Sequence, residues 1–279
     1  MDTSLSVIDS RGSSWRNWII ENIKRGCTDT TIVKEMISKG VWTLQEATQA
    51  VAYVHESINN EIYRLPTIPY LNSINIDSQE IKVTGRVNKP KATLLENLLS
   101  KEECLELIRL ATLKGLNRSM VADNTNGGNI LSEGRTSTIV HFTLDENILV
   151  STISTRIAKL TDWATNKAEG IQILCYEEGQ QYKPHFDWFD PNVSGTAVHL
   201  GASGQRVGTT VIYLATSESG GCTSFPDSGL EFCPSVGGAV FFNSVDSNGL
   251  PDRSTLHAAT PVVRGVKIVA VYWQREKAF

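Results

Sequence analysis

The sequence lacks several features that would assign it to a well-known class of protein. No Gly-x-Gly-x-x-Gly, P-loop or Gly-x-Ser-x-Gly pattern occurs, which disfavours dinucleotide binding, phosphoryl transfer and serine hydrolase chemistry. The net charge is −4, and no basic run with interleaved aromatics occurs, so we expect no nucleic-acid partner. No apolar run approaches the ~20 residues that span a bilayer. The opening "MDTSLSVIDSRGSSW" has no signal-peptide pattern, so we expect a cytoplasmic protein that does not bind membranes.

Cysteine is scarce and has no metal-binding spacing. The five residues are widely scattered and include no Cys-x-x-Cys pair: Cys27, Cys104, Cys175, Cys222 and Cys233. This argues against a disulfide framework or a structural zinc site. A bridge between Cys222 and Cys233 stays open, but we expect reduced, mostly buried thiols.

The first part of the chain has the periodicity of helices. Between Trp15 and about Asn59 the apolar residues recur at helical spacing, which predicts three short helices, the third opened by a Thr43-x-x-Glu46 capping box. We therefore expect a helical appendage over residues 1–62. Two roles stay open for it: a bundle that packs against the main domain, and a docking module for a partner or substrate.

The rest of the chain predicts a connection and then a mainly β domain. Residues 63–89 contain Pro66 and Pro69 and are expected to form an irregular connection. Residues 90–279 begin with a short strand and a helix with a Ser100-x-x-Glu103 capping box, and a further helix fits residues 146–166. The segment "ADNTNGGNILSEG" has the composition of a loop.

The period changes to two after Gly170. The segments "IQILCYEEG", "TTVIYLA", "GAVFF" and "VKIVAVYW" predict strands separated by Gly, Pro, Ser and Asp clusters. This pattern is typical of an antiparallel sandwich or barrel.

Within this region, "YEEGQQYKPHFDWFD" carries a His185-x-Asp187 pair. Residues two apart on an extended segment point to the same face, so one imidazole and one carboxylate can enter one cavity. His257 precedes the last predicted strand and offers a second imidazole. Two imidazoles and one carboxylate leave three coordination positions open, which suits ferrous iron that binds a keto acid and dioxygen.

Lys267 lies inside "VKIVAVYW", where a buried strand carries apolar residues. A buried lysine needs a fixed anion, and the distal carboxylate of 2-oxoglutarate would provide one. Periodicity alone does not distinguish this buried position from a second one, in which Lys267 faces solvent on an edge strand.

From about Pro90 to Glu276 the chain resembles the catalytic domain of prolyl 4-hydroxylases, which are Fe(II)- and 2-oxoglutarate-dependent dioxygenases. Seven blocks match in family order: "PKATLLENLLSKEECLELI", "GRTST", "YEEGQQYKPHFD", "QRVGTTVIYL", "GGCTSFP", "GGAVFF" and "STLHAATPVVRGVK". The resemblance implies a double-stranded β-helix, or jelly roll, of the mainly β (α+β) class with packed helices. It also implies hydroxylation of an unactivated C–H bond, with succinate and CO2 as coproducts.

The resemblance also implies roles for individual residues. His185, Asp187 and His257 would bind Fe(II), and Lys267 would pair with the 2-oxoglutarate carboxylate. Two further residues match positions that hydrogen-bond this cosubstrate, namely Tyr176 and Thr223. Three match positions toward the substrate or lining the site, namely Arg206, Arg135 and Trp273. Dioxygen is the other cosubstrate, and ascorbate is a further cofactor to test.

Two departures from the family bear on the substrate. Cys222 stands where the family often has glutamate, and Ile268 where it often has tryptophan. The substrate is therefore expected to be a prolyl peptide or a proline-like compound, with a free amino acid or an amino-acid-derived small molecule as the alternative. The polar, glycine-rich segments 122–137 and 190–206 are candidates for lids over it, or are simple connections.

Other kinds of protein stay open as alternatives. A zinc hydrolase could use the same three ligands, but it would have no use for Lys267. A non-catalytic binding module on this fold would have no need of the complete ligand set. A halogenase of the related class lacks the ligand carboxylate that Asp187 supplies here. The oligomeric state is not indicated by the sequence.

Overall fold

The computed structural model describes residues 13–62, 64–122, 128–201 and 203–279. The chain divides into two compact units, residues 1–64 and 65–279, each of which is considered by itself. Among the described helices, none combines the length and the apolar character needed to cross a membrane.

The first unit contains the three predicted helices. They are α2 (Ser13–Lys24), α3 (Asp29–Ser38) and α4 (Leu44–Ile62). Their apolar faces share one core, in which Ile19, Met36 and Val54 are fully buried. The Thr43–Glu46 capping box is confirmed, since the Glu46 carboxylate accepts from the Thr43 backbone N–H at 2.9 Å and the Thr43 hydroxyl accepts from the Glu46 N–H at 3.3 Å.

The second unit is built on a nine-stranded antiparallel sheet with the order β1-β2-β3-β14-β10-β17-β8-β7-β4. In chain order the strands are β1 (Ser73–Ile76), β2 (Gln79–Asn88), β3 (Lys91–Glu96), β4 (Asn117–Arg118), β7 (Thr138–Phe142), β8 (Ala168–Tyr176), β10 (Arg206–Ala215), β14 (Ala239–Asn243) and β17 (Lys267–Arg275). The four strand segments expected after Gly170 are thereby confirmed as β8, β10, β14 and β17.

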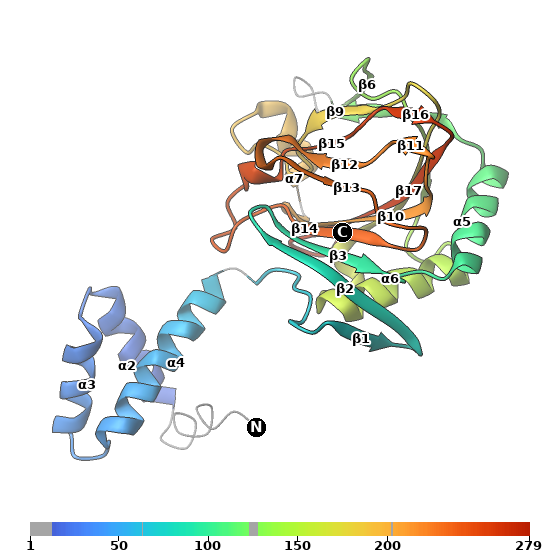
Figure 1. Cartoon of the computed structure of the whole chain (residues 1–279). Coiled ribbons are helices and arrows are strands. Elements are labelled where there is room, and N and C mark those ends of the chain that lie inside the picture. The colour runs from blue at the N-terminus through green and yellow to red at the C-terminus, as the bar shows by residue number, and fades with distance from the viewer. Residues whose placement is uncertain (1–12, 63, 123–127, 202) are drawn as a thin grey trace. The chain divides into compact units, whose positions relative to one another are not determined.

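A smaller sheet has the order β13-β12-β15-β9, and its strands run side by side in Figure 1. They are β9 (Tyr182–His185), β12 (Thr223–Phe225), β13 (Leu230–Phe232) and β15 (His257–Ala259). Two pairs of short strands complete the sheets: β5 (Met120–Ala122) with β6 (Asn129–Leu131), and β11 (Ser219–Gly220) with β16 (Val262–Arg264). This two-sheet architecture agrees with the expected jelly roll.

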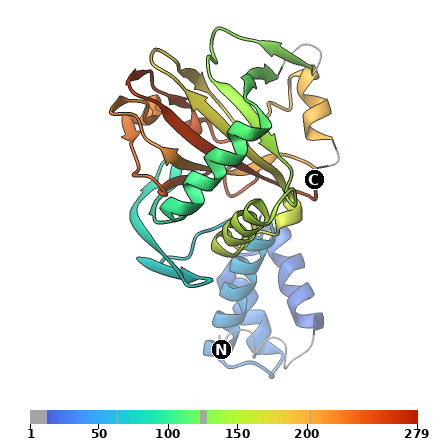
Figure 2. The same cartoon turned by 90° about the vertical axis from the view of Figure 1, so that its right-hand side faces the viewer.

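Helices cover one face of the large sheet. α5 (Lys101–Lys114) and α6 (Ile148–Thr161) lie on the same side of it, as Figure 2 shows. Alternate strand residues such as Ile171, Ile212 and Ala270 pack toward them in one core. The intervening residues, such as Val211 and Val269, form a second core on the other face. Because side chains alternate along a strand, the face opposite the helices is free to carry a site.

Two sequence expectations for this unit are wrong in detail. Residues 73–88 lie within the segment expected to be irregular but form β1 and β2; β1 pairs with β2, and β2 also pairs with β3. The signal was present in the sequence, because Ile74 and Ile76 in β1, and Ile81, Val83 and Val87 in β2, alternate with polar residues. The prolines at the start of the segment favoured an irregular connection instead. In the expected loop 122–134, residues 129–131 form β6, while residues 123–127 lie outside the described residues.

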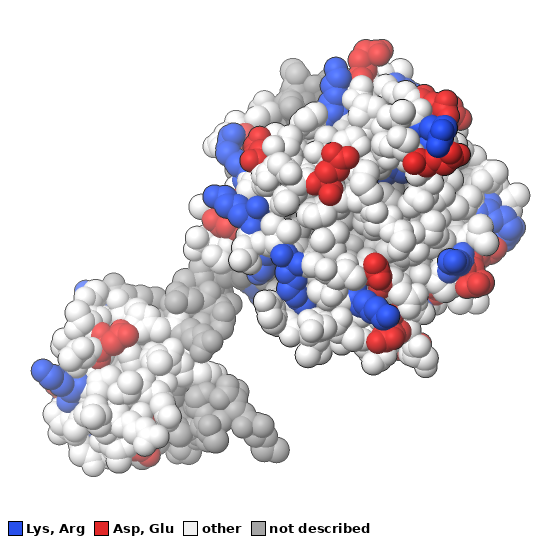
Figure 3. All heavy atoms as spheres, in the orientation of Figure 1, with Lys and Arg blue, Asp and Glu red and all other residues white. Residues whose placement is uncertain are grey.

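Charged side chains are mixed on the face seen in Figure 3, where basic and acidic residues lie next to one another. Exposed ion pairs of the described residues include Arg264–Glu218, at 2.7 Å. Pairs of this kind contribute little to stability, with a median of about 0–1 kcal/mol.

One ion pair inside the second unit is expected to matter more. Glu103 completes the capping box of α5 and also binds the buried Arg156 guanidinium through two contacts of 2.7 Å. Glu103→Ala leaves that guanidinium buried without its counter-charge, so we expect a loss of roughly 3–5 kcal/mol in the free energy of unfolding.

Urea denaturation of the full chain measures this loss. Glu106→Ala is the matched control, because Glu106 lies on the same helix and pairs with Arg109 at the surface. It should cost less than about 1 kcal/mol. Equal losses for the two variants would contradict this assignment.

Candidate active site

Three side chains of the kinds that bind metal ions meet where the small sheet faces the large one. His185 ends β9 and His257 begins β15, and the two residues are paired in register across these strands. Asp187 lies two residues after the end of β9. Its carboxylate oxygens lie 3.8 Å from His185 Nε2 and 3.6 Å from His257 Nε2. The ligand atoms of the three residues all lie within 4.8 Å of one another, so one metal ion could contact all three.

Hydrogen bonds orient both imidazoles. His185 Nδ1 lies 2.9 Å from the Lys183 carbonyl, and His257 Nδ1 lies 2.9 Å from the Thr255 carbonyl. A carbonyl accepts only, so each Nδ1 donates and each Nε2 keeps its lone pair. This is the arrangement found around metal-bound histidines, in which the second ring nitrogen is held by a backbone carbonyl.

The electrostatics also favour the protonation states that a metal requires. Burial, with a further contribution from His257, lowers the pKa of His185 to about 3, which keeps its imidazole neutral. Burial by itself would raise the pKa of Asp187, but the two imidazoles and the Arg206 guanidinium bring it below its usual range. The Thr209 hydroxyl donates to Asp187 Oδ2 at 2.8 Å and fixes the carboxylate.

Lys267 is the first residue of β17, and only 2% of its surface is exposed. The alternative placement on a solvent-facing edge is therefore wrong, because β17 lies between β10 and β8. Burial lowers the pKa of Lys267 to about 7. No carboxylate of the described residues forms an ion pair with its ammonium group.

Aromatic and hydroxyl side chains surround this lysine. Tyr176 is its cross-strand partner on β8, and the ammonium group lies 5.3 Å from the Tyr176 ring and 5.1 Å from the Tyr213 ring. The Tyr213 hydroxyl forms a hydrogen bond with the hydroxyl of Thr223. Burial raises the pKa of Tyr176 to about 12, so its hydroxyl stays protonated and can donate. Tyr213 was not identified from the sequence, because it falls at an ordinary core position of a strand.

One pocket brings together eight of the nine residues singled out from the sequence. It is lined by His185, Asp187, His257, Lys267, Tyr176, Thr223, Arg135 and Trp273. The ninth, Arg206, lines an adjoining groove of about 1090 Å³ that also reaches His185 and Asp187. The pocket therefore has an end with three potential metal ligands, an end with the Lys267 ammonium group and an adjoining wider groove.

The two arginines of the site differ in their partners. Arg206 binds the Glu169 carboxylate through two contacts of 2.7 Å and stacks 3.7 Å from the Trp273 ring. Arg135 donates to the Met120 carbonyl and stacks on Tyr182, but its buried Nε has no partner among the described residues. Glu169 was not identified from the sequence, because a single acid near the start of a strand carries no functional signal.

The two segments expected as lids differ from simple loops. The described part of residues 122–137 contributes Asn129, Ser132 and Gly134 to the groove. The segment 190–206 contains a 3₁₀ turn at Ser194–Thr196 and the short helix α7 (Ala197–Leu200), and it contributes Val193 and His199. Both segments therefore border the groove; closure over a bound substrate stays a prediction.

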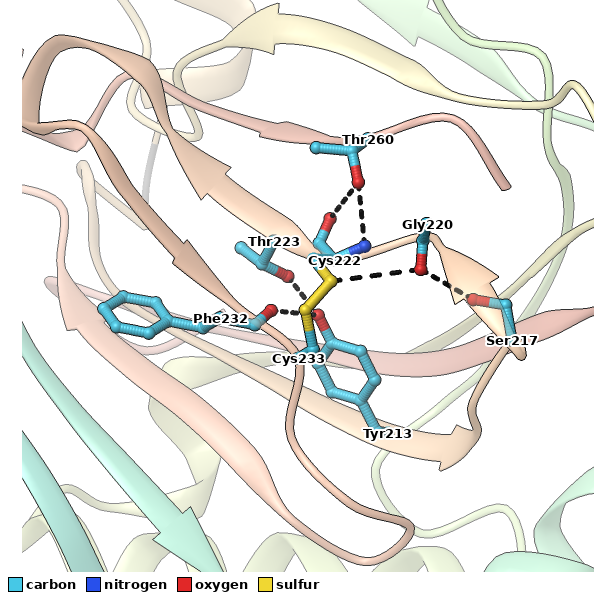
Figure 4. The surroundings of a disulfide bond; sticks show 8 residues. All are labelled: Tyr213, Ser217, Gly220, Cys222, Thr223, Phe232, Cys233 and Thr260. Carbon is cyan, nitrogen blue, oxygen red and sulfur yellow. Dashed lines mark hydrogen bonds between the residues drawn. A yellow bond between two sulfur atoms is a disulfide. The ribbon is translucent and has the colours of Figure 1, made fainter. Parts of the chain in front are cut away.

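Cys222 and Cys233 form a disulfide, so the expectation of reduced thiols is wrong for this pair (Figure 4). They flank β12 and β13, whose antiparallel pairing brings the two residues to a Cα–Cα distance of 4.7 Å. A spacing of 11 residues does not by itself indicate such a hairpin. The remaining cysteines, Cys27, Cys104 and Cys175, are free thiols.

Comparisons with known proteins point to one kind of enzyme. A family model of the 2OG-Fe(II) oxygenase superfamily matches residues 171–275. Probable prolyl 4-hydroxylase 7 of Arabidopsis thaliana is 36% identical over 71% of this chain, which spans 66% of that protein. Prolyl 4-hydroxylase 2 of the same plant is 32% identical, with 71% of each chain covered.

A solved structure is similar as well. The viral collagen prolyl hydroxylase of Paramecium Bursaria Chlorella virus-1, in complex with 2-oxoglutarate, matches with a TM-score of 0.52 and 26% identity. The match covers 66% of this chain and 95% of the viral one.

Loss of any one metal-ligating side chain is expected to weaken metal binding strongly. The binding free energy of a structural zinc site is roughly 10–16 kcal/mol, which corresponds to about 3 kcal/mol for each of its ligands. A loss of about 3 kcal/mol lowers the affinity about 100-fold. His185→Ala, Asp187→Ala and His257→Ala should each show this loss in anaerobic calorimetric titration with Fe(II).

His55→Ala is the control, because His55 belongs to the first unit and pairs with Asp29. It should bind Fe(II) as the unchanged protein does. Unchanged affinity in any of the three site variants would show that this residue is not a ligand.

Proposed function

Because the chain belongs to the prolyl 4-hydroxylase family of Fe(II)- and 2-oxoglutarate-dependent dioxygenases, we propose that it hydroxylates a prolyl residue in a peptide. It is an enzyme that uses Fe(II), 2-oxoglutarate and dioxygen. The observation that carries the proposal is the single pocket with three metal-ligating side chains at one end and a buried, uncompensated lysine at the other.

We assign the metal to His185, Asp187 and His257. Bound iron supplies the redox chemistry that inserts an oxygen atom into an unactivated C–H bond while 2-oxoglutarate is converted to succinate and CO2. The protein supplies neutral imidazoles held by backbone carbonyls and a carboxylate held by Thr209. Tyr182, whose ring stacks 3.5 Å from the His185 ring, limits the access of water to the metal ligands.

Lys267 is assigned to the distal carboxylate of 2-oxoglutarate. A buried ammonium group without a carboxylate partner is costly, and a bound dianion would relieve that cost. The Tyr176 and Thr223 hydroxyls lie in the same pocket and are assigned as further hydrogen-bond partners of the cosubstrate. In a zinc hydrolase this lysine would have no role.

The wide groove supports a peptide as the substrate. Its lining includes Arg118, Lys183 and Arg253, which are exposed and have no carboxylate partner among the described residues, whereas Asp190 is its only acidic group besides Asp187. The chain as a whole carries a net charge of −4, so the groove is locally opposite in sign to the protein. We therefore infer that acidic residues beside the target proline favour binding.

A free amino acid or a related small acid is the second candidate. The unpartnered Nε of the buried Arg135 favours it, because a substrate carboxylate would complete the guanidinium's hydrogen bonds. Arg206 is the weaker anchor for such an acid, since Glu169 already occupies its guanidinium. A cytoplasmic location and a role for ascorbate stay predictions.

Lys267→Ala is expected to raise the apparent Michaelis constant for 2-oxoglutarate by at least about 100-fold, since leaving one partner of a buried charge pair alone costs roughly 3–5 kcal/mol. Succinate release measures this effect. Fe(II) affinity should stay within about twofold, because Lys267 is assigned to no metal contact. Lys267→Arg should restore 2-oxoglutarate binding only in part, because the larger, planar guanidinium group does not replace a compact ammonium group.

Lys82→Ala is the control variant, since Lys82 is exposed on β2 and lies outside the pocket and the groove. An unchanged Michaelis constant in Lys267→Ala would remove Lys267 from the cosubstrate site.

The lysine also predicts a pH dependence of 2-oxoglutarate binding. Only the ammonium form attracts the anion, and in the free protein its pKa is about 7. Below that pH the lysine is protonated, and the dissociation constant of 2-oxoglutarate should not depend on pH. Above it the protein must take up a proton on binding, so the dissociation constant should rise about tenfold per pH unit. Anaerobic titration of the Mn(II)-loaded protein between pH 6 and 9 measures this, and a flat profile in the unchanged protein would contradict it.

Peptides that differ only beside the target proline test the substrate. We expect kcat/KM to be highest with glutamate beside the proline, lower with glutamine and lowest with lysine, with a total difference of about tenfold. Added salt should reduce this difference. Lys183→Gln should reduce the preference, with Lys82→Gln as the matched control. Mass spectrometry locates the added oxygen atom. Turnover confined to free acids, and lost when their carboxylate is amidated, would replace the peptide by the second candidate.

A further inference from the structure

The Cys222–Cys233 disulfide closes a hairpin that borders the cosubstrate pocket. Cys222 directly precedes β12 and Cys233 directly follows β13, so the bridge lies beside the pair Thr223↔Phe232, the end pair of these strands. The strands share three register pairs. β12 is also paired with β15, whereas β13 lies at the edge of this sheet and pairs with β12 alone. The bridge therefore adds a covalent link between the edge strand and the rest of the sheet.

The pair next to the bridge holds Tyr213. The Tyr213 hydroxyl contacts the Thr223 hydroxyl and donates to the Phe232 carbonyl at 3.3 Å, so one phenol spans both strands (Figure 4). The ring of the same tyrosine lies 5.1 Å from the Lys267 ammonium. A shift of β12 against β13 would therefore move groups that contact the lysine end of the pocket.

The backbone beside Cys222 is tied to the same region. Cys222 N–H donates to the Thr260 hydroxyl at 2.8 Å, and Thr260 N–H donates to the Cys222 carbonyl at 3.0 Å. Gly221 has φ +70°, and a Cβ at that position would lie 3.4 Å from Cδ of Lys267. The bridge is thus fixed to the chain that follows β15 and packs directly beside the Lys267 side chain.

We propose that the Cys222–Cys233 disulfide is a positioning element for the cosubstrate pocket, and that its reduction weakens the binding of 2-oxoglutarate. The inference rests on the proposed function, because it takes the pocket at Lys267 as the cosubstrate site. The hydrogen bonds of Cys222 go to Gly220 and Thr260, and not to the three residues assigned to the metal. We therefore expect reduction to weaken the binding of 2-oxoglutarate and to leave the metal bound.

The redox step needs a dithiol reductant. Cys233 is exposed whereas Cys222 is 7% exposed, so a reductant thiolate reaches the Cys233 sulfur first. A bond forms between these two sulfurs, the bond between Cys233 and Cys222 breaks, and Cys222 leaves as a thiolate that takes up a proton. The second thiol of the reductant then displaces Cys233 as a thiol. Two electrons and two protons pass to the protein, and the reductant becomes a cyclic disulfide.

Anaerobic calorimetric titration of the full chain, loaded with Mn(II), tests the proposal. Oxidised and dithiol-reduced protein are each titrated with 2-oxoglutarate, and alkylation followed by mass spectrometry reports the state of the bridge. We expect the dissociation constant to rise about fivefold on reduction, corresponding to the loss of about one hydrogen bond. Mn(II) affinity should stay within about twofold.

Two variants separate the bridge from other effects of the dithiol. Cys222→Ser/Cys233→Ser should bind 2-oxoglutarate as weakly as the reduced protein and should not respond to the dithiol. Cys175→Ser retains the bridge and should respond as the unchanged protein does. If the double variant fails to fold, the oxidised and reduced forms of the unchanged protein still give the comparison.

The outcomes distinguish the two proposals. Equal dissociation constants in the oxidised and fully reduced protein would overturn the redox inference and leave the cosubstrate site standing. Absence of 2-oxoglutarate binding in both states would overturn the cosubstrate site, and the redox inference with it.

Discussion

The buried ammonium group of Lys267 is the constraint on which the rest of the site depends. A buried charge without a counter-charge is unfavourable, and no carboxylate of the described residues forms an ion pair with Lys267. The Asp187 carboxylate is also buried, but two imidazoles and the Thr209 hydroxyl surround it. The pocket is therefore suited to a ligand that is anionic at one end and chelates a metal at the other, and 2-oxoglutarate has this shape.

The sheets determine where these charges lie. Alternation along β8, β10 and β17 directs one set of side chains into the core beneath α5 and α6 and the other set into the site. The small sheet then brings His185 and His257 together as a cross-strand pair. Rigid strands hold the metal-ligating groups, whereas the borders of the groove come from shorter elements, which is the usual division between a catalytic scaffold and substrate-selecting segments.

A second layer of polar contacts supports the groups that face the pocket. Glu169 holds Arg206 against Trp273, and the Tyr213 hydroxyl bridges Thr223 and Phe232. Each contact is buried or nearly so, which strengthens it and makes its loss costly. The disulfide is covalent support of the same kind, placed where a short strand pair has few hydrogen bonds of its own.

The sequence alone predicted the main strands and the helices with both capping boxes, because these depend on local periodicity. Its resemblance to prolyl 4-hydroxylases implied the jelly-roll class and the reaction class. It also singled out eight residues that line one pocket. It did not predict β1 and β2, which extend the large sheet through the pairing of β2 with β3, or the disulfide, which needs the β12–β13 hairpin. Only the tertiary structure decided that Lys267 is buried, that Arg206 is already paired with Glu169 and that Tyr213 supports Thr223, because burial and partners across strands arise from contacts between segments far apart in the chain.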